Sequence, residues 1–225
     1  MILTTLQEVS PLQTEKTLSI IELIKNGGLG GQLIIGILFF LLLMVVYIYF
    51  ERLFAIRSAV KVGPNFMPQI RTFVMNGKVE GAKELCSTEN VPVSRLVHKG
   101  LSRIGRPLDD INTAIENAGR LEVYQLEKNI SILATIAGAA PMLGFLGTVI
   151  GMILSIFEIS NAGGNIDMQL LADGLYTAMT TTVAGLIVGI FGYITYNHLV
   201  VKTNKAVYQM EATSLEFLDL LNEPA

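Results

Sequence analysis

The chain has 225 residues, of which 51% are hydrophobic and 16% are charged, and its formal net charge is −3. A mean hydropathy of +0.53 places it among membrane proteins. The single cysteine, Cys86, excludes an intrachain disulfide and a cysteine-based metal site, and the two histidines, His98 and His198, lie far apart in the sequence. We therefore expect neither a metal ion nor another cofactor.

Residues 1–28 precede the first apolar span and lack the basic start of a secretory signal peptide. Residues 12–25 are amphipathic, which predicts a short helix resting on the membrane surface. A frayed helical extension of the following span explains the same pattern equally well. That span, residues 29–50, contains no charge and reaches the roughly 20 apolar residues needed to cross a bilayer.

Residues 51–130 are mostly helical by pattern and are divided into short helices by breaking residues. The breakers are Pro64, Pro68, Asn76-Gly77, Pro92 and Pro107. The helix that starts at Pro107 meets no further breaker before the second apolar span, so we expect one long helix that continues into the membrane.

The charged and apolar residues of this long helix are expected to lie on opposite faces. The solvated face would carry Glu116, Arg120, Glu122, Glu127 and Lys128, and the apolar period includes Leu121 and Leu126. Because acids interleave with the basic residues of this region, they do not form the concentrated positive surface that binds nucleic acid.

The second span, residues 131–157, carries a stripe of small and hydroxyl residues at spacings of three and four, which places them on one helix face. The stripe comprises Ala137, Pro141, Gly144, Thr148, Gly151 and Ser155, and Glu158 continues it. The third span, residues 174–197, repeats the rhythm with Ala178, Thr182, Gly185, Gly189, Gly192 and Tyr196. Such stripes indicate close helix packing or a polar path through the membrane.

The basic residues predict the orientation of the chain in the membrane. Residues 51–130 hold most of the Lys and Arg, whereas the loop of residues 158–173 holds none. The positive-inside tendency then places residues 51–130 and the tail, residues 198–225, in the cytoplasm, with the N-terminus and the acidic loop on the opposite side. We expect a multi-pass membrane protein, in direct contact with lipid.

No phosphate-binding loop, dinucleotide glycine fingerprint or nucleophile elbow occurs in the sequence, so we expect no enzyme. The fold class that we predict is an all-α membrane protein with three transmembrane helices and long helices extending into the cytoplasm.

Three runs of sequence carry a family resemblance: AAPMLGFLGTVIGM at residues 139–152, GLYTAMTTTVAGL at 174–186 and YITYN at 193–197. They resemble the second and third transmembrane helices of the proton-channel family that contains ExbB, TolQ and MotA. The three-span layout is more similar to ExbB and TolQ than to the four-span MotA. The resemblance implies a homo-oligomeric ring, typically of five subunits, in a bacterial inner membrane, with the N-terminus in the periplasm. The ring would surround helices of a single-span partner such as ExbD or TolR with an intramembrane Asp, and a TonB- or TolA-like protein would complete the complex.

The resemblance also implies roles for individual residues. Thr148 and Thr182 match the two pore-facing threonines of the family, and we add Thr181 and Thr177 as candidates for the ion path. Thr177 stands where ExbB-like members usually carry a glutamate, so the partner would have to supply the carboxylate. The candidate packing residues are Pro141, Gly144, Gly147, Gly151, Ala178, Gly185 and Gly189.

Glu158 has two interpretations, a loop residue at the membrane interface or an acid at the mouth of a pore. Two function hypotheses also stand. The first is an ion-conducting motor subunit that uses the proton motive force for work at the outer membrane, such as TonB-dependent transport. The second is a non-conducting membrane scaffold of a secretion or motility complex. A secondary transporter is a distant third, because internal repeats are not visible.

Overall fold

The computed structural model describes residues 28–59, 61–161 and 168–222. The helices are α2 (Gly28–Ala59), α3 (Phe66–Met75), α4 (Val79–Glu89), α5 (Pro92–Leu101), α6 (Leu108–Glu127), α7 (Ile130–Asn161) and α8 (Met168–Asn222). No strand occurs among the described residues. The amphipathic segment expected at residues 12–25 lies outside them.

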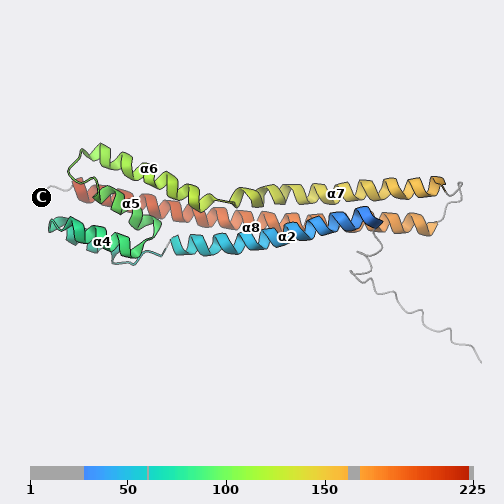
Figure 1. Cartoon of the computed structure of the whole chain (residues 1–225), viewed down its shortest axis with the longest axis horizontal. Coiled ribbons are helices and arrows are strands. Elements are labelled where there is room, and N and C mark those ends of the chain that lie inside the picture. The colour runs from blue at the N-terminus through green and yellow to red at the C-terminus, as the bar shows by residue number, and fades with distance from the viewer. Residues whose placement is uncertain (1–27, 60, 162–167, 223–225) are drawn as a thin grey trace, which may run out of the picture.

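The molecule is a long bundle in which α8 runs from end to end, with α2 and α7 alongside it and α4, α5 and α6 gathered at one end (Figure 1). Three helical stretches are long and apolar enough to cross a membrane: Gly30–Ala59, Leu108–Asn161 and Gly174–Asn222. The expected all-helical class with three spans is therefore confirmed.

Helix α2 turns one apolar face towards the bundle and leaves another uncovered. Ile34, Leu38 and Val45 are buried at helical spacing, whereas Phe39 and Phe40 are 60% and 64% exposed. Bulky exposed side chains on an apolar helix suit contact with lipid chains.

The expected continuous helix from Pro107 through the second span is wrong, because the chain breaks between α6 and α7. Lys128 has an extended ψ of 134° and Asn129 a positive φ of 64°. Asn is one of the few residues that adopt left-handed backbone at little cost. The break lets α6 leave the line of α7 at the end where α4 and α5 lie (Figure 1).

Two side chains of α6 lie opposite to expectation. Glu122, expected on the solvated face, is only 13% exposed at its side chain and forms an ion pair with Arg95 of α5. Leu121, expected on the apolar face, is 67% exposed. The ion pair with Arg95 offsets the free-energy cost of removing the Glu122 carboxylate from water. Helical periodicity within α6 cannot predict this ion pair, because Arg95 belongs to another helix.

The other breakers behave as helix boundaries, with one exception. Asn76 and Gly77 end α3, Pro92 is the first residue of α5, and Pro107 precedes α6. Pro68 lies within the first turn of α3, where its missing N–H has no partner to lose.

Helix α8 continues 25 residues beyond the predicted end of the third span, to Asn222. Neither Gly nor Pro occurs between Tyr193 and Glu223, so nothing in the sequence stops the helix. Near its end, the fully buried Phe217 packs against Gly100 of α5, and the side chain of Ile115 from α6 lies at the same glycine. The last part of α8 is thereby the core of the α4–α6 end.

Candidate functional site

The α7–α8 contact is a direct approach of two helix backbones. A Cβ added at Gly144 would lie 2.8 Å from the carbonyl oxygen of Thr181 and 3.1 Å from the Cα of Gly185. A Cβ added at Gly185 would lie 2.6 Å from the carbonyl oxygen of Ala140. Distances below 3.0 Å leave no room for a side chain, so these two glycines set the separation of the helices.

The ring of Pro141 packs against α8 at Gly189, where the absence of a side chain leaves space for it. A Cβ at Gly189 would lie 2.8 Å from Cδ of Pro141 and 3.1 Å from the carbonyl oxygen of Ala137. Because proline has no N–H, the Ala137 carbonyl loses its usual helical donor. The ring and the freed carbonyl thus both face α8 at this level.

Further along the contact, Gly147 and Gly151 of α7 meet Thr181 and Ala178 of α8. A Cβ at Gly147 would lie 2.7 Å from Cβ of Thr181, and one at Gly151 would lie 3.1 Å from Cβ of Ala178. All seven candidate packing residues therefore lie in the contact between two helices of one chain.

The hydroxyl groups of Thr148 and Thr182 meet across this contact and form a hydrogen bond with each other. Thr148 Oγ1 also donates to the carbonyl oxygen of Ala178 at 3.0 Å, and Thr182 Oγ1 to that of Gly144 at 3.2 Å. Each hydroxyl has one proton and two acceptor positions, so these bonds are alternatives that exchange by rotation of the hydroxyl. Both side chains are half-buried, which leaves the pair at the edge of the helix contact.

Thr181 is placed differently from this pair. It is 0% exposed, and its Oγ1 donates to the carbonyl oxygen of Ala178 at 2.8 Å or of Gly144 at 3.3 Å. Its hydroxyl is therefore enclosed between α7 and α8. The side chain of Thr177 lies outside the described residues.

Glu158 is exposed near the end of α7. It follows Thr148 by ten residues, about 15 Å along the helix axis at 1.5 Å per residue. The structure therefore does not bring Glu158 together with the threonine pair.

Two buried hydroxyl residues near the contact were not among the candidates. Ser155 is 4% exposed and donates to the carbonyl oxygen of Gly151 at 2.8 Å, with its side chain against Gly174. Thr195 is 4% exposed and donates to the carbonyl oxygen of Phe191 at 2.9 Å. Ser155 was visible in the stripe of the second span, whereas Thr195 lies one position beside the stripe of the third.

Between Ser131 and Phe157, and again between Gly174 and Tyr196, the sequence contains no Asp, Glu, His, Lys or Arg. The contact thus offers hydroxyl and carbonyl oxygens but no group that gains or loses a proton near neutral pH. It can orient water or a cation, and any proton acceptor must come from elsewhere.

The model of the MotA/TolQ/ExbB proton channel family matches residues 88–212, more than half of the chain. The chain belongs to this family, and is a membrane subunit of the ExbB/TolQ type.

Three relatives indicate the breadth of the similarity. A putative biopolymer transport protein ExbB homolog of Methanothermobacter thermautotrophicus is 27% identical over 86% of this chain and 67% of its own length. The biopolymer transport protein ExbB of Aquifex aeolicus is 38% identical over 48% of this chain and 74% of its own length. The Tol-Pal system protein TolQ of Haemophilus influenzae is 30% identical over 50% of this chain and 49% of its own length.

Proposed function

We propose that this chain is the ring-forming subunit of a proton-driven motor in a bacterial inner membrane. Five copies would surround the membrane helix of an ExbD- or TolR-like partner, and the complex would transmit work to a TonB- or TolA-like protein. Residues 51–130 and the end of α8 would face the cytoplasm, because nearly all basic residues lie there.

The observation that carries the proposal is the hydroxyl pair of Thr148 and Thr182. Half-buried hydroxyls at the edge of a small-residue contact provide hydrogen-bonding groups in an otherwise apolar part of the membrane. We place the ion path along these two residues. Thr181 supports it by holding the backbones of α7 and α8 together, and Glu158 would attract cations at one mouth.

The proton-carrying group in this proposal is an Asp on the partner helix. A carboxyl group in a dry environment is favoured in its neutral form, which lets it take up a proton and later release it. Threonine at Thr177 cannot take this role. Each proton that crosses the membrane down its electrical gradient would release roughly 2.3 kcal/mol of free energy per 100 mV of membrane potential.

Replacement of both Thr148 and Thr182 by Val tests the proposal, because Val has nearly the shape of Thr without the hydroxyl. We expect the double variant to assemble normally and to lose at least about tenfold of its proton flux, which corresponds to about 1.4 kcal/mol. Flux would be measured in vesicles that contain the chain and its partner. The matched control is Thr180→Val, since Thr180 Oγ1 donates to the carbonyl oxygen of Tyr176 within its own helix and to no other group among the described residues.

A double variant with unchanged flux and unchanged motor activity would contradict the ion path along these threonines. Motor activity that persists when the partner Asp is replaced by Asn would contradict the proton-driven mechanism as a whole. In that case a non-conducting scaffold, held by the same helix contact, would describe the chain better.

A further inference from the structure

A cavity of about 730 Å³ lies where α2, α5 and α6 meet, away from the threonine pair. This volume falls within the roughly 300–1,000 Å³ typical of small-molecule sites. The residues that matter for its chemistry are Arg52, Arg95, Glu122 and Lys128, together with the start of α5 at Val91 and Pro92.

Positive charge predominates in the wall of this cavity. Arg95 forms a bidentate ion pair with Glu122, in which Nε and Nη2 donate to the two carboxylate oxygens at 2.7 and 2.6 Å. Its Nη1 donates to the carbonyl oxygen of Asn90 at 2.9 Å, which fixes the start of α5. Besides this pair, the wall carries Arg52, which pairs with Glu51, and Lys128.

Arg52 is held in place by two of its guanidinium nitrogens, and the third has no hydrogen-bond partner among the described residues. The residue is only 9% exposed; its Nη1 donates to the carbonyl oxygen of Gln125 at 3.1 Å, and its Nη2 pairs with Glu51. This third nitrogen, Nε, is not accessible from the cavity, so a ligand would bind the second N–H of Nη1 or Nη2. A buried positive charge is costly, and an anionic ligand beside the guanidinium reduces that cost.

Lys128 is exposed at the break between α6 and α7. No ion pair or hydrogen bond of its ammonium group is present among the described residues. The N-terminal end of α5 adds the partial positive charge of a helix dipole to the same wall.

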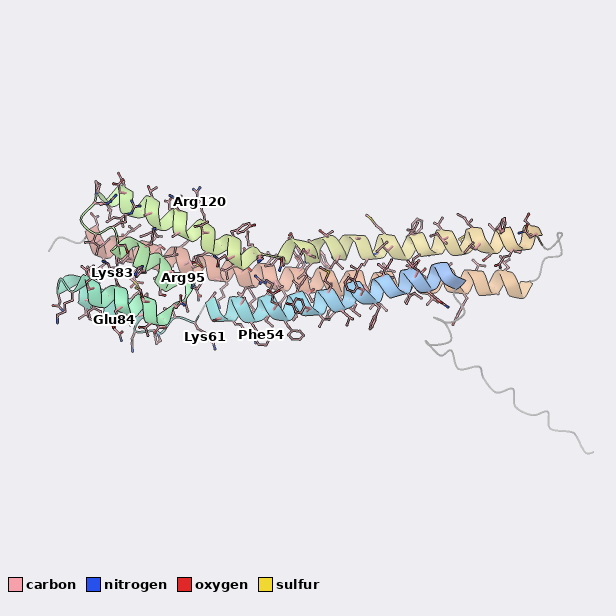
Figure 2. All side chains as sticks on the ribbon, viewed as in Figure 1. Phe54, Lys61, Lys83, Glu84, Arg95 and Arg120 are labelled. Carbon is pink, nitrogen blue, oxygen red and sulfur yellow. The ribbon has the colours of Figure 1, made fainter. Side chains whose placement is uncertain are left out.

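The level of the cavity along the bundle indicates the ligand. Arg52 comes two residues after Phe50, at the end of the uncharged stretch of α2, and Lys128 comes two residues before α7 begins at Ile130. The cavity thus lies where two apolar spans meet their first charges. Figure 2 shows Arg95 on α5 at this same end of the molecule, towards which Phe54 and Lys61 also lie. In a membrane, this is the depth of the phospholipid headgroups.

We propose that this cavity binds a phosphate group through Arg52 and Lys128, and that the headgroup of an anionic phospholipid is its source. Arg52 and Lys128 would bind the phosphate oxygens, while the acyl chains would extend along the exposed apolar surface of α2. The ligand would join α2 to the α6–α7 break, two elements that otherwise meet here mainly through Arg52 and Gln125.

The test is native mass spectrometry of the full chain in detergent, titrated with phosphatidylglycerol. Lys128→Gln, at an exposed position, is expected to weaken binding about tenfold, and Arg52→Gln at least as much. The matched control is Arg57→Gln, which removes the same charge from the same helix outside the cavity wall, and is expected to change binding less than twofold.

A parallel titration with sodium phosphate distinguishes the two sources of the phosphate group. If free phosphate does not displace phosphatidylglycerol, the lipid headgroup is the source of the phosphate. If free phosphate displaces the lipid, and does so less well in Lys128→Gln, the site binds phosphate from a soluble ligand. Equal lipid binding by wild type and Lys128→Gln would overturn the proposal. Equal losses in Lys128→Gln and Arg57→Gln would overturn it too, because they would show a general surface attraction.

Discussion

At Gly144 the backbones of α7 and α8 are so close that the missing side chain is what permits their contact. The Cβ of any other residue would lie 2.8 Å from the Thr181 carbonyl oxygen, and 3.1 Å from two backbone Cα atoms of α8. Backbone atoms cannot move aside as a flexible side chain can. The helices would have to separate, with loss of the hydrogen bonds that Thr148, Thr181 and Thr182 make across the contact.

We therefore expect Gly144→Leu to lower the free energy of unfolding by about 1–3 kcal/mol or more, which is the cost of overpacking a close contact. The thermal unfolding midpoint of the detergent-solubilised chain measures this effect. Gly138→Leu is the control on the same helix, because a Cβ there meets nothing within 4 Å. Similar midpoints for the two variants would show that Gly144 does not set the helix separation.

Cys86 gives a pH-dependent prediction at the same scale. Burial in α4 raises the pKa of its thiol from 9.0 to about 12. The unfolded chain releases this proton near pH 9 and the folded chain only near pH 12, so the unfolded state binds fewer protons between these values. The contribution of Cys86 to stability is then constant below pH 9 and falls as pH rises above it, by up to about 1.4 kcal/mol per unit.

Unfolding midpoints of wild type and Cys86→Ala, measured from pH 7 to 11, test this sign. We expect the stability of the wild type to fall more steeply than that of the variant only above about pH 9. Comparison of the two chains removes the titration of Lys and Tyr, which both contain. Parallel curves over the whole range would contradict the raised pKa.

At the scale of the element, α8 joins the membrane part of the bundle to the α4–α6 end. Its 55 residues are one uninterrupted helix, with Ala178 buried against α7 near one end and Phe217 buried between α5 and α6 near the other. A continuous helix is stiff, so packing at Phe217 and packing at the threonine pair belong to one rigid element. A force on the α4–α6 end would thereby reach the membrane contact.

Phe217→Ala is expected to destabilise the α4–α6 end by about 3–5 kcal/mol, because it removes a fully buried aromatic side chain. Limited proteolysis of residues 61–127 in the purified chain would measure the loosening of this end. Leu215→Ala is the control, since Leu215 is 63% exposed on the same helix and its truncation should cost less than about 0.5 kcal/mol. Equal protease resistance of Phe217→Ala and wild type would show that Phe217 does not hold this end together.

At the scale of the whole molecule, large apolar side chains of the membrane-spanning helices remain exposed on the single chain, and they are candidates for contacts between subunits. Met142 and Phe145 of α7 are 73% and 65% exposed, and Ile187 and Ile190 of α8 are each 59% exposed. In lipid, apolar exposure alone does not drive association, and close packing of small residues does. The small residues of the two stripes are engaged within the chain, so we expect contacts between subunits to use mainly the larger exposed side chains of these helices.

We expect the purified chain to form a pentamer in mild detergent, with a protein mass of five 24.5 kDa subunits by native mass spectrometry. Replacement of both Phe145 and Ile187 by Ala should shift the population towards smaller species, because it shortens side chains available only for contacts outside the subunit. Phe39→Ala, on the exposed face of α2, is the control. A wild-type chain that is monomeric in several detergents would contradict the ring.

The sequence by itself determined much about this protein, because periodicity and charge act locally. Uncharged runs of apolar residues specify three membrane helices, and Asn76-Gly77, Pro92 and Pro107 specify where helices begin or end. The stripe spacings also placed Thr148 and Thr182 on the helix faces that later proved to meet. Each of these features depends on one helix and its nearest residues along the chain.

Only the tertiary structure decided which partners those faces have. The small-residue stripes of α7 and α8 pack against each other within one subunit, whereas the sequence left open whether they met within or between subunits. Glu122 can turn away from solvent, with its side chain only 13% exposed, because Arg95 lies opposite it on α5, 27 residues away. The cavity beside Arg52 likewise exists only because α2, α5 and α6 meet there. Contacts between residues distant along the chain carry no signal in local periodicity, so they appear only when the helices are assembled.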